Sequence, residues 1–158
     1  MNIADLQAYV ASLLVEDREE LEDDGLRIHD CLLPGGYDSS PPGYLAFAST
    51  GGDGVHFSIP SGRAGPVVMT VPMAFDNPNV VVGSDLKDFL SLGCVYGYFG
   101  LEQLAYNEDR TINYIEATKE QSYALQQLSR HFNLRPWQAV AHHLAALKLA
   151  HPLGPTCT

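Results

Sequence analysis

Asp53 and His56 are the pair of residues whose types and spacing come nearest to a catalytic arrangement. They stand three positions apart across a glycine-rich turn, so the carboxylate can reach the imidazole and hold it in one tautomer, as a general base requires. No serine or cysteine is placed beside them as a nucleophile, and aspartate is a common turn former. We therefore assign Asp53 to the turn and His56 to a polar contact on one face of a sheet. A small hydrolase or transferase that uses this pair stays as an alternative.

The sequence also gives little support for a metal site or a phosphate site. The turn at 51–54, Gly-Gly-Asp-Gly, lacks the lysine of a phosphate-binding loop and leads into an apolar, strand-like run. His142 and His143 are adjacent, so they point in different directions on a helix, and no HExxH motif occurs. Cys31 and Cys94 stand among apolar residues, which is typical of small buried side chains. We expect no metal, no cofactor and no enzymatic activity.

The charge of the 158-residue chain is concentrated in its first part. The net charge is −10, and residues 1–60 hold eleven acids and two bases, which gives −9. Free nucleic acid is an unsuitable partner, because phosphate binding requires lysine and arginine. A basic protein is compatible, since complementary potentials speed encounter. The simpler alternative is that the charge serves only solubility.

Two sets of residues are candidates for contact with such a partner. The first is an acidic run that ends at Gly25 and whose structure, helical or not, the sequence leaves open; its candidate residues are Glu19, Glu20, Glu22, Asp23 and Asp24. The second is an aromatic stretch with Tyr96 and Tyr98, which suits a partner-binding face or a ligand cleft. We expect the neighbouring Phe99 to be structural.

Three features indicate a cytoplasmic protein. No apolar run is long enough to span a membrane. The first ten residues carry an acid and no base, unlike a signal peptide. The three cysteines have no CxxC spacing, which argues against a disulfide framework, and we expect Cys157 to lie in a frayed tail.

The elements that position these residues follow from apolar spacing. The spacing predicts helix over 3–14, an extended segment over 26–33, strands over 44–48, 55–59, 67–71 and 79–82, and helices capped by Ser84, over 99–106, from Thr118 to 132 and from Pro136 onward. A helix, then a run of strands, then a run of helices is typical of an α+β fold. We expect a single domain over 1–158, with a small, mostly antiparallel sheet framed by N-terminal and C-terminal helices.

The block from about residue 40 to 106 resembles the SUKH superfamily, the group of bacterial immunity proteins related to Syd and to the Smi/Knr cell-wall regulators. Three segments carry the resemblance: LAFASTGGDGVHFSI, then PVVMTVP followed by NVVVGSDLKDFLSLGC, and GYFGLEQLAY. The resemblance implies an α+β fold and a binding protein, with no shared catalytic residues to carry over. Many bacterial members neutralise toxins, often nucleases.

The sequence thus predicts a non-enzymatic protein-binding module, an immunity protein that covers a basic toxin with an acidic surface. The alternative is a ligand-binding or oligomeric scaffold, including a homodimer, in which Tyr96, Tyr98 and Tyr106 surround a pocket.

Overall fold

The strands of the computed structural model form one antiparallel sheet in which each strand pairs with its neighbour in sequence, in the order β1-β2-β3-β4-β5. The structure describes residues 1–117 and 120–153. The strands are β1 (Arg27–Pro34), β2 (Tyr44–Ser49), β3 (His56–Pro60), β4 (Val67–Thr70) and β5 (Asn79–Gly83). The predicted α+β class and the small antiparallel sheet are confirmed.

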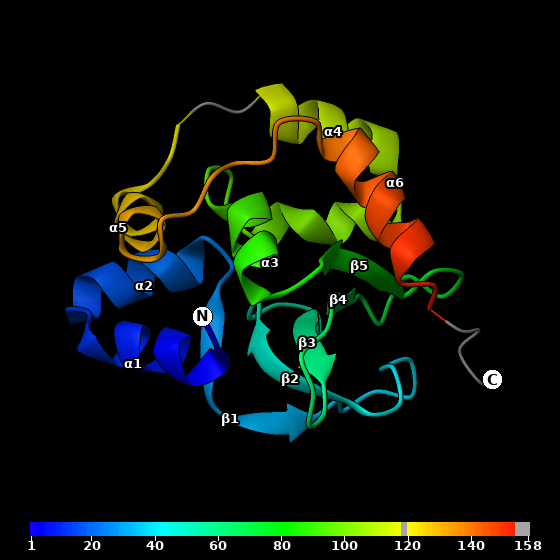
Figure 1. The fold of residues 1–158 in the computed structure, drawn as a ribbon, viewed down its shortest axis with the longest axis horizontal. Coiled ribbons are helices and arrows are strands. Elements are labelled where there is room, and N and C mark those ends of the chain that lie inside the picture. The colour runs from blue at the N-terminus through cyan, green and yellow to red at the C-terminus, as the bar shows by residue number, and fades with distance from the viewer. Residues whose placement is uncertain (118–119, 154–158) are drawn as a thin grey trace.

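Helices lie at both ends of the chain, as predicted. They are α1 (Ile3–Ser12), α2 (Val15–Asp23), α3 (Leu86–Gly93), the 3-10 helix η1 (Phe99–Ala105), α4 (Glu108–Ala117), α5 (Tyr123–Phe132) and α6 (Val140–Ala150). Figure 1 shows α1, α2 and α5 grouped at one end of the molecule, α4 and α6 at the other, and α3 between the two groups.

The turn between β2 and β3 explains the glycine-rich motif. Gly51, Asp53 and Gly54 all have positive φ angles of +49° to +81°, a conformation that glycine adopts without strain and aspartate tolerates. The motif therefore serves the geometry of the hairpin, as its sequence indicates.

The predicted helix boundaries are wrong at two places. Asp85 rather than Ser84 caps α3, because its side chain accepts a hydrogen bond from the Asp88 N–H at 2.9 Å. The final helix begins at Val140 and not at Pro136. The intervening Trp137 donates its indole N–H to the Asp88 carbonyl at 3.1 Å, a tertiary contact that competes with helix formation.

The other helices show how capping decides where each begins. Ser122 caps α5 by accepting a hydrogen bond from the Leu125 N–H, while the predicted cap Thr118 lies outside the described residues. The predicted end of this helix is confirmed, because Asn133 has φ +49° and closes it in the left-handed conformation. The sequence reasoning missed α4 entirely.

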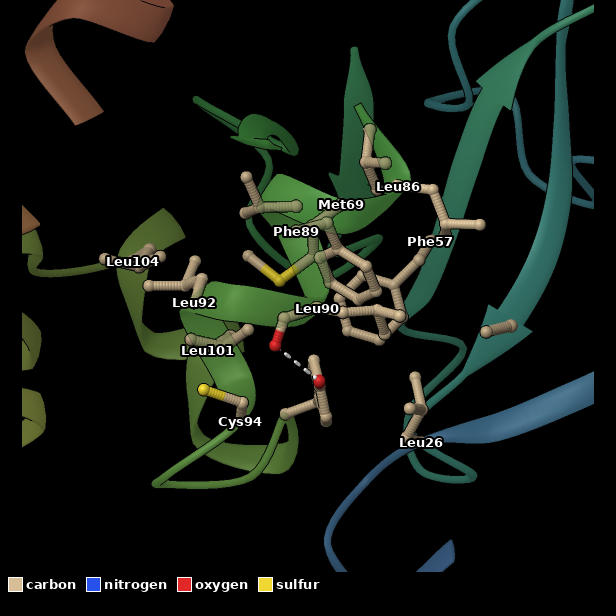
Figure 2. Close-up of a cluster of buried hydrophobic side chains, with 14 of the residues drawn as sticks. Leu26, Phe57, Met69, Leu86, Phe89, Leu90, Leu92, Cys94, Leu101 and Leu104 are labelled. Carbon is tan, nitrogen blue, oxygen red and sulfur yellow. Dashed lines mark hydrogen bonds between the residues drawn. The ribbon is translucent and has the colours of Figure 1, made fainter. Parts of the chain in front are cut away.

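The main core lies between α3 and the sheet and contains a cluster of four aromatic rings. The Phe89 ring centroid lies 4.7 Å from that of Phe57, 5.1 Å from that of Tyr98 and 5.8 Å from that of Phe47. All four side chains are fully buried. Figure 2 shows Phe57 and Phe89 side by side, with Met69, Leu86 and Leu90 around them.

Of the two cysteines predicted to be buried, one is buried and the other is exposed. Cys94 is buried, as its apolar neighbours indicate, and burial raises the pKa of its thiol. Cys31 is exposed, because it lies in an irregular part of the edge strand β1 where the register with β2 shifts between Ile28 and Leu33. Cys157 lies outside the described residues. Among the helices the structure describes, none combines the length and the apolar character needed to cross a membrane.

Candidate functional site

The acidic run is an ordered helix, α2, and α5 holds it in place. One Glu20 carboxylate oxygen accepts a hydrogen bond from the backbone N–H of Ala124 at 2.8 Å, and the Asp24 carboxylate accepts one from the Ser122 hydroxyl. Both contacts place negative charge at the N-terminus of α5, where the helix dipole favours it. Leu21 is buried on the same element.

Contacts within the molecule therefore separate the five acidic candidates into two groups. Glu20 bonds to the first turn of α5, Asp24 bonds to the hydroxyl of its capping residue, and Glu22 forms an ion pair with Arg27 at 3.2 Å. Glu19 and Asp23 are exposed to solvent. The surface charge that α2 offers a partner is thus carried mainly by Glu19 and Asp23, together with the exposed Glu16, which the sequence reasoning did not single out.

The charges of α2 repel one another at its C-terminal end. Burial raises the pKa of the Asp24 carboxyl above its usual value; the Ser122 hydrogen bond opposes this, and the charges of Glu20 and Asp23 add to it. Carboxylates near a helix C-terminus are also unfavourable for the helix dipole. The packing of α2 against α5 and the buried Leu21 must therefore offset this repulsion.

The predicted partner-binding role of Tyr98 is wrong. Its side chain has 0% exposure, and its hydroxyl donates to the Leu90 carbonyl at 2.8 Å, the dashed line in Figure 2. Burial raises the pKa of this hydroxyl well above its usual value. Tyr96 is partly buried and Tyr106 is exposed. Because Tyr98 is buried in the core, the three tyrosines do not surround a common pocket.

The exposed aromatic side chain at the start of η1 is Phe99 and not the predicted Tyr98. Its side chain is 53% exposed, although its sequence context suggests a structural residue. Its backbone N–H donates to the Asp24 carbonyl at 3.1 Å, so η1 begins directly against the end of α2. The ring lies close to the β2–β3 turn, since a Cβ atom placed on Gly52 would be 3.8 Å from the ring. Gly25 and Gly97 are a sequence signal for this arrangement, since a Cβ atom would lie 2.3 Å from the Phe99 nitrogen at Gly25 and 2.8 Å from the Asp24 carbonyl oxygen at Gly97.

A cavity opens beside Phe99, between η1 and α4. Its volume is about 440 Å³, and Phe99 and Tyr114 lie on its walls together with Glu102 and Arg110. Tyr114 is 62% exposed. Phe99 and Tyr114 therefore offer exposed aromatic surface to a partner at this cavity.

His56 has two polar partners, and neither is Asp53. The Nδ1–H donates to the Gly54 carbonyl at 2.8 Å, which leaves Nε2 of the neutral ring to accept from the Ser40 hydroxyl at 3.2 Å. The ring is 6% exposed and stacks on Tyr37. These contacts fit the predicted polar role of His56 on the sheet, and they connect the loop before β2 to β3. Asp53 lies in the turn and is exposed.

Acid is expected to weaken the fold through His56. Burial lowers the pKa of this imidazole; the Gly54 hydrogen bond raises it and the charge of His29 lowers it. A folded-state pKa below the usual value of about 6.5 means that the neutral ring stabilises the fold above about pH 6.5. That stabilisation is lost as the pH falls below this value toward the folded-state pKa, because protonation puts a charge on a buried ring.

Urea unfolding at about pH 7.5 and about pH 5 measures this effect. The loss of stability between the two values should be smaller in His56→Asn than in the parent protein. His142→Asn, on an exposed side chain of α6, is the matched control and should lose as much stability as the parent. Equal losses in all three proteins would contradict the assignment.

Among residues 1–117 and 120–153, no three side chains of His, Cys, Asp or Glu gather closely enough to hold a metal ion. Of the two adjacent histidines of α6, His143 stacks on Trp137 with ring centroids 3.8 Å apart and lies 3.1 Å from an Asp88 carboxylate oxygen. It therefore joins α6 to α3.

No protein-family model, no curated protein and no solved structure matches this chain.

Proposed function

We propose that this protein is a non-enzymatic binding module that recognises a basic protein through the exposed carboxylates of α2. The observation that carries the proposal is the pairing of an uneven charge distribution with an ordered acidic helix. The first 60 residues have a net charge of −9, and Glu16, Glu19 and Asp23 are exposed on an element that α5 holds in place. A rigid array of like charges attracts an oppositely charged partner and orients it during encounter.

The partner we propose is a bacterial toxin, in a cytoplasmic immunity complex, and a nuclease fits best. A nuclease groove must be basic in order to hold phosphates, so an acidic helix can occupy the surface that the nucleic acid would use. The SUKH resemblance of residues 40–106 supports the same class of partner and stays a prediction. A hydrolase that uses His56 is less well supported, because its ring nitrogens bond to Gly54 and Ser40.

The test is binding to the protein toxins encoded beside this gene, with association rates measured by stopped-flow kinetics and affinities by calorimetry, at low and moderate salt. In the variant Glu16→Gln/Glu19→Gln/Asp23→Asn we expect the association rate to fall by about tenfold and the salt dependence of binding to become shallower. For a nuclease toxin, inhibition of nucleic-acid cleavage should require correspondingly more of the variant.

A control variant carries the same change in charge elsewhere. Asp38, Asp76 and Glu120 are also exposed, and Asp38→Asn/Asp76→Asn/Glu120→Gln should bind nearly as fast as the parent protein. Equal binding by the two triple variants, or no binding to any neighbouring toxin at low salt, would count decisively against the proposal.

A further inference from the structure

The cavity between η1 and α4 lies beside the acidic helix. The Phe99 N–H donates to the carbonyl of Asp24, the residue that follows α2. The start of η1, which carries one wall of the cavity, is therefore in contact with the C-terminal end of α2. The cavity volume, about 440 Å³, lies in the range of about 300–1,000 Å³ that ligand-binding pockets usually have.

Aromatic and acidic side chains both line this cavity. Phe99 and Glu102 are three residues apart on η1, and side chains with this spacing lie on the same side of a 3-10 helix. Both line the cavity, and the exposed ring of Tyr114 lies on the α4 side. A flat aromatic face next to a carboxylate matches one side chain in particular. The guanidinium of arginine stacks on aromatic rings and forms paired hydrogen bonds with carboxylates, whereas the ammonium of lysine is a compact, strongly hydrated charge.

We propose that this cavity binds an arginine side chain of the basic partner, with the guanidinium stacked on Phe99 and paired with Glu102. The inference rests on the proposed function and names the chemistry by which the partner is anchored. Arg110 also lines the cavity from α4, and its charge opposes a second cation. The guanidinium therefore sits at the η1 side, close to α2, and removal of the Arg110 charge should strengthen binding.

The experiment compares a hexa-arginine peptide with a hexalysine peptide, each titrated into the full chain by NMR and calorimetry. The parent protein should bind hexa-arginine more tightly than hexalysine. In Phe99→Leu and in Glu102→Gln, affinity for hexa-arginine should fall by about two- to fivefold, while affinity for hexalysine changes less. Arg110→Gln should raise the affinity for hexa-arginine, and Phe99→Trp, which keeps an aromatic face, should retain the preference for arginine.

Phe75 provides the matched control, because it is 82% exposed in the loop between β4 and β5. Phe75→Leu should bind both peptides as the parent does. Equal affinity of the parent protein for the two peptides, or the same preference for arginine in Phe99→Leu, would overturn the proposal that this cavity binds an arginine side chain. Self-association that Phe99→Leu abolishes would place a second copy of the chain on this face and would also overturn it.

The α2 triple variant separates this inference from the proposed function. Weaker binding of both peptides in that variant, with no effect of Phe99→Leu, would reject the anchor and leave the acidic face supported. Unchanged binding of both peptides and of the neighbouring toxins in the α2 variant would reject the proposed function, whether or not the cavity selects arginine.

Discussion

Replacing Phe89 with alanine is expected to lower the free energy of unfolding by about 3–5 kcal/mol. The ring lies at the centre of the aromatic cluster, with the rings of Phe47, Phe57 and Tyr98 within 5.8 Å between centroids. Removing it takes away the apolar surface that packs α3 on the sheet and leaves a cavity. The surrounding strands cannot close this cavity, because they are fixed by pairing on both sides.

Urea unfolding at neutral pH measures the loss, and Phe75→Ala is the control. Phe75 is the same residue type but largely exposed, so its replacement should change the stability by no more than about 0.5 kcal/mol. Similar small effects of the two substitutions would show that the aromatic cluster does not hold α3 on the sheet.

The second large effect is expected for Gly25→Ala, with a loss of about 2–5 kcal/mol. Gly25 follows α2 with φ +84°, a conformation that strains any residue with a side chain. A Cβ atom at this position would also lie 2.3 Å from the backbone nitrogen of Phe99. The substitution therefore has to push η1 away from α2, which breaks the hydrogen bond between the Phe99 N–H and the Asp24 carbonyl.

Gly43→Ala separates the two causes of this loss. Gly43 has a similar φ of +76°, but a Cβ atom there would meet nothing within 4 Å. Its replacement should cost only the backbone strain, about 1–2 kcal/mol. If Gly25→Ala proves no more destabilising than Gly43→Ala in the same urea titration, α2 and η1 are not in close contact.

The sheet was predictable from sequence because its signals are local. The glycine turn at 51–54 and the apolar runs around it predict a hairpin, and Asn79–Gly83 follows from its valines. The helix boundaries were less predictable, since they depend on contacts across the fold. Trp137 reaches Asp88 on α3, and no periodicity within residues 136–149 records that contact.

The same limit applies to the candidate site. The sequence identifies an acidic run, but which carboxylates face solvent depends on α5, which is about a hundred residues away. Tyr98 and Phe99 exchange their expected places for a related reason. They are adjacent, so the direction in which η1 begins decides which ring is buried, and Asp24 sets that direction through its carbonyl. The cavity between η1 and α4 could not be predicted either, because the sequence analysis did not predict α4.

The hydrogen bonds that Glu20 and Asp24 accept from Ala124 and Ser122 have a consequence for synthesis. These contacts join positions 98 and 104 residues apart, and contacts of such long sequence separation form slowly. While the ribosome is still making the middle of the chain, Glu20 and Asp24 lack their partners at residues 122–124 and repel each other. The face proposed to meet a toxin is thus completed only when most of the polypeptide has emerged, so premature termination would release a chain without a finished binding surface.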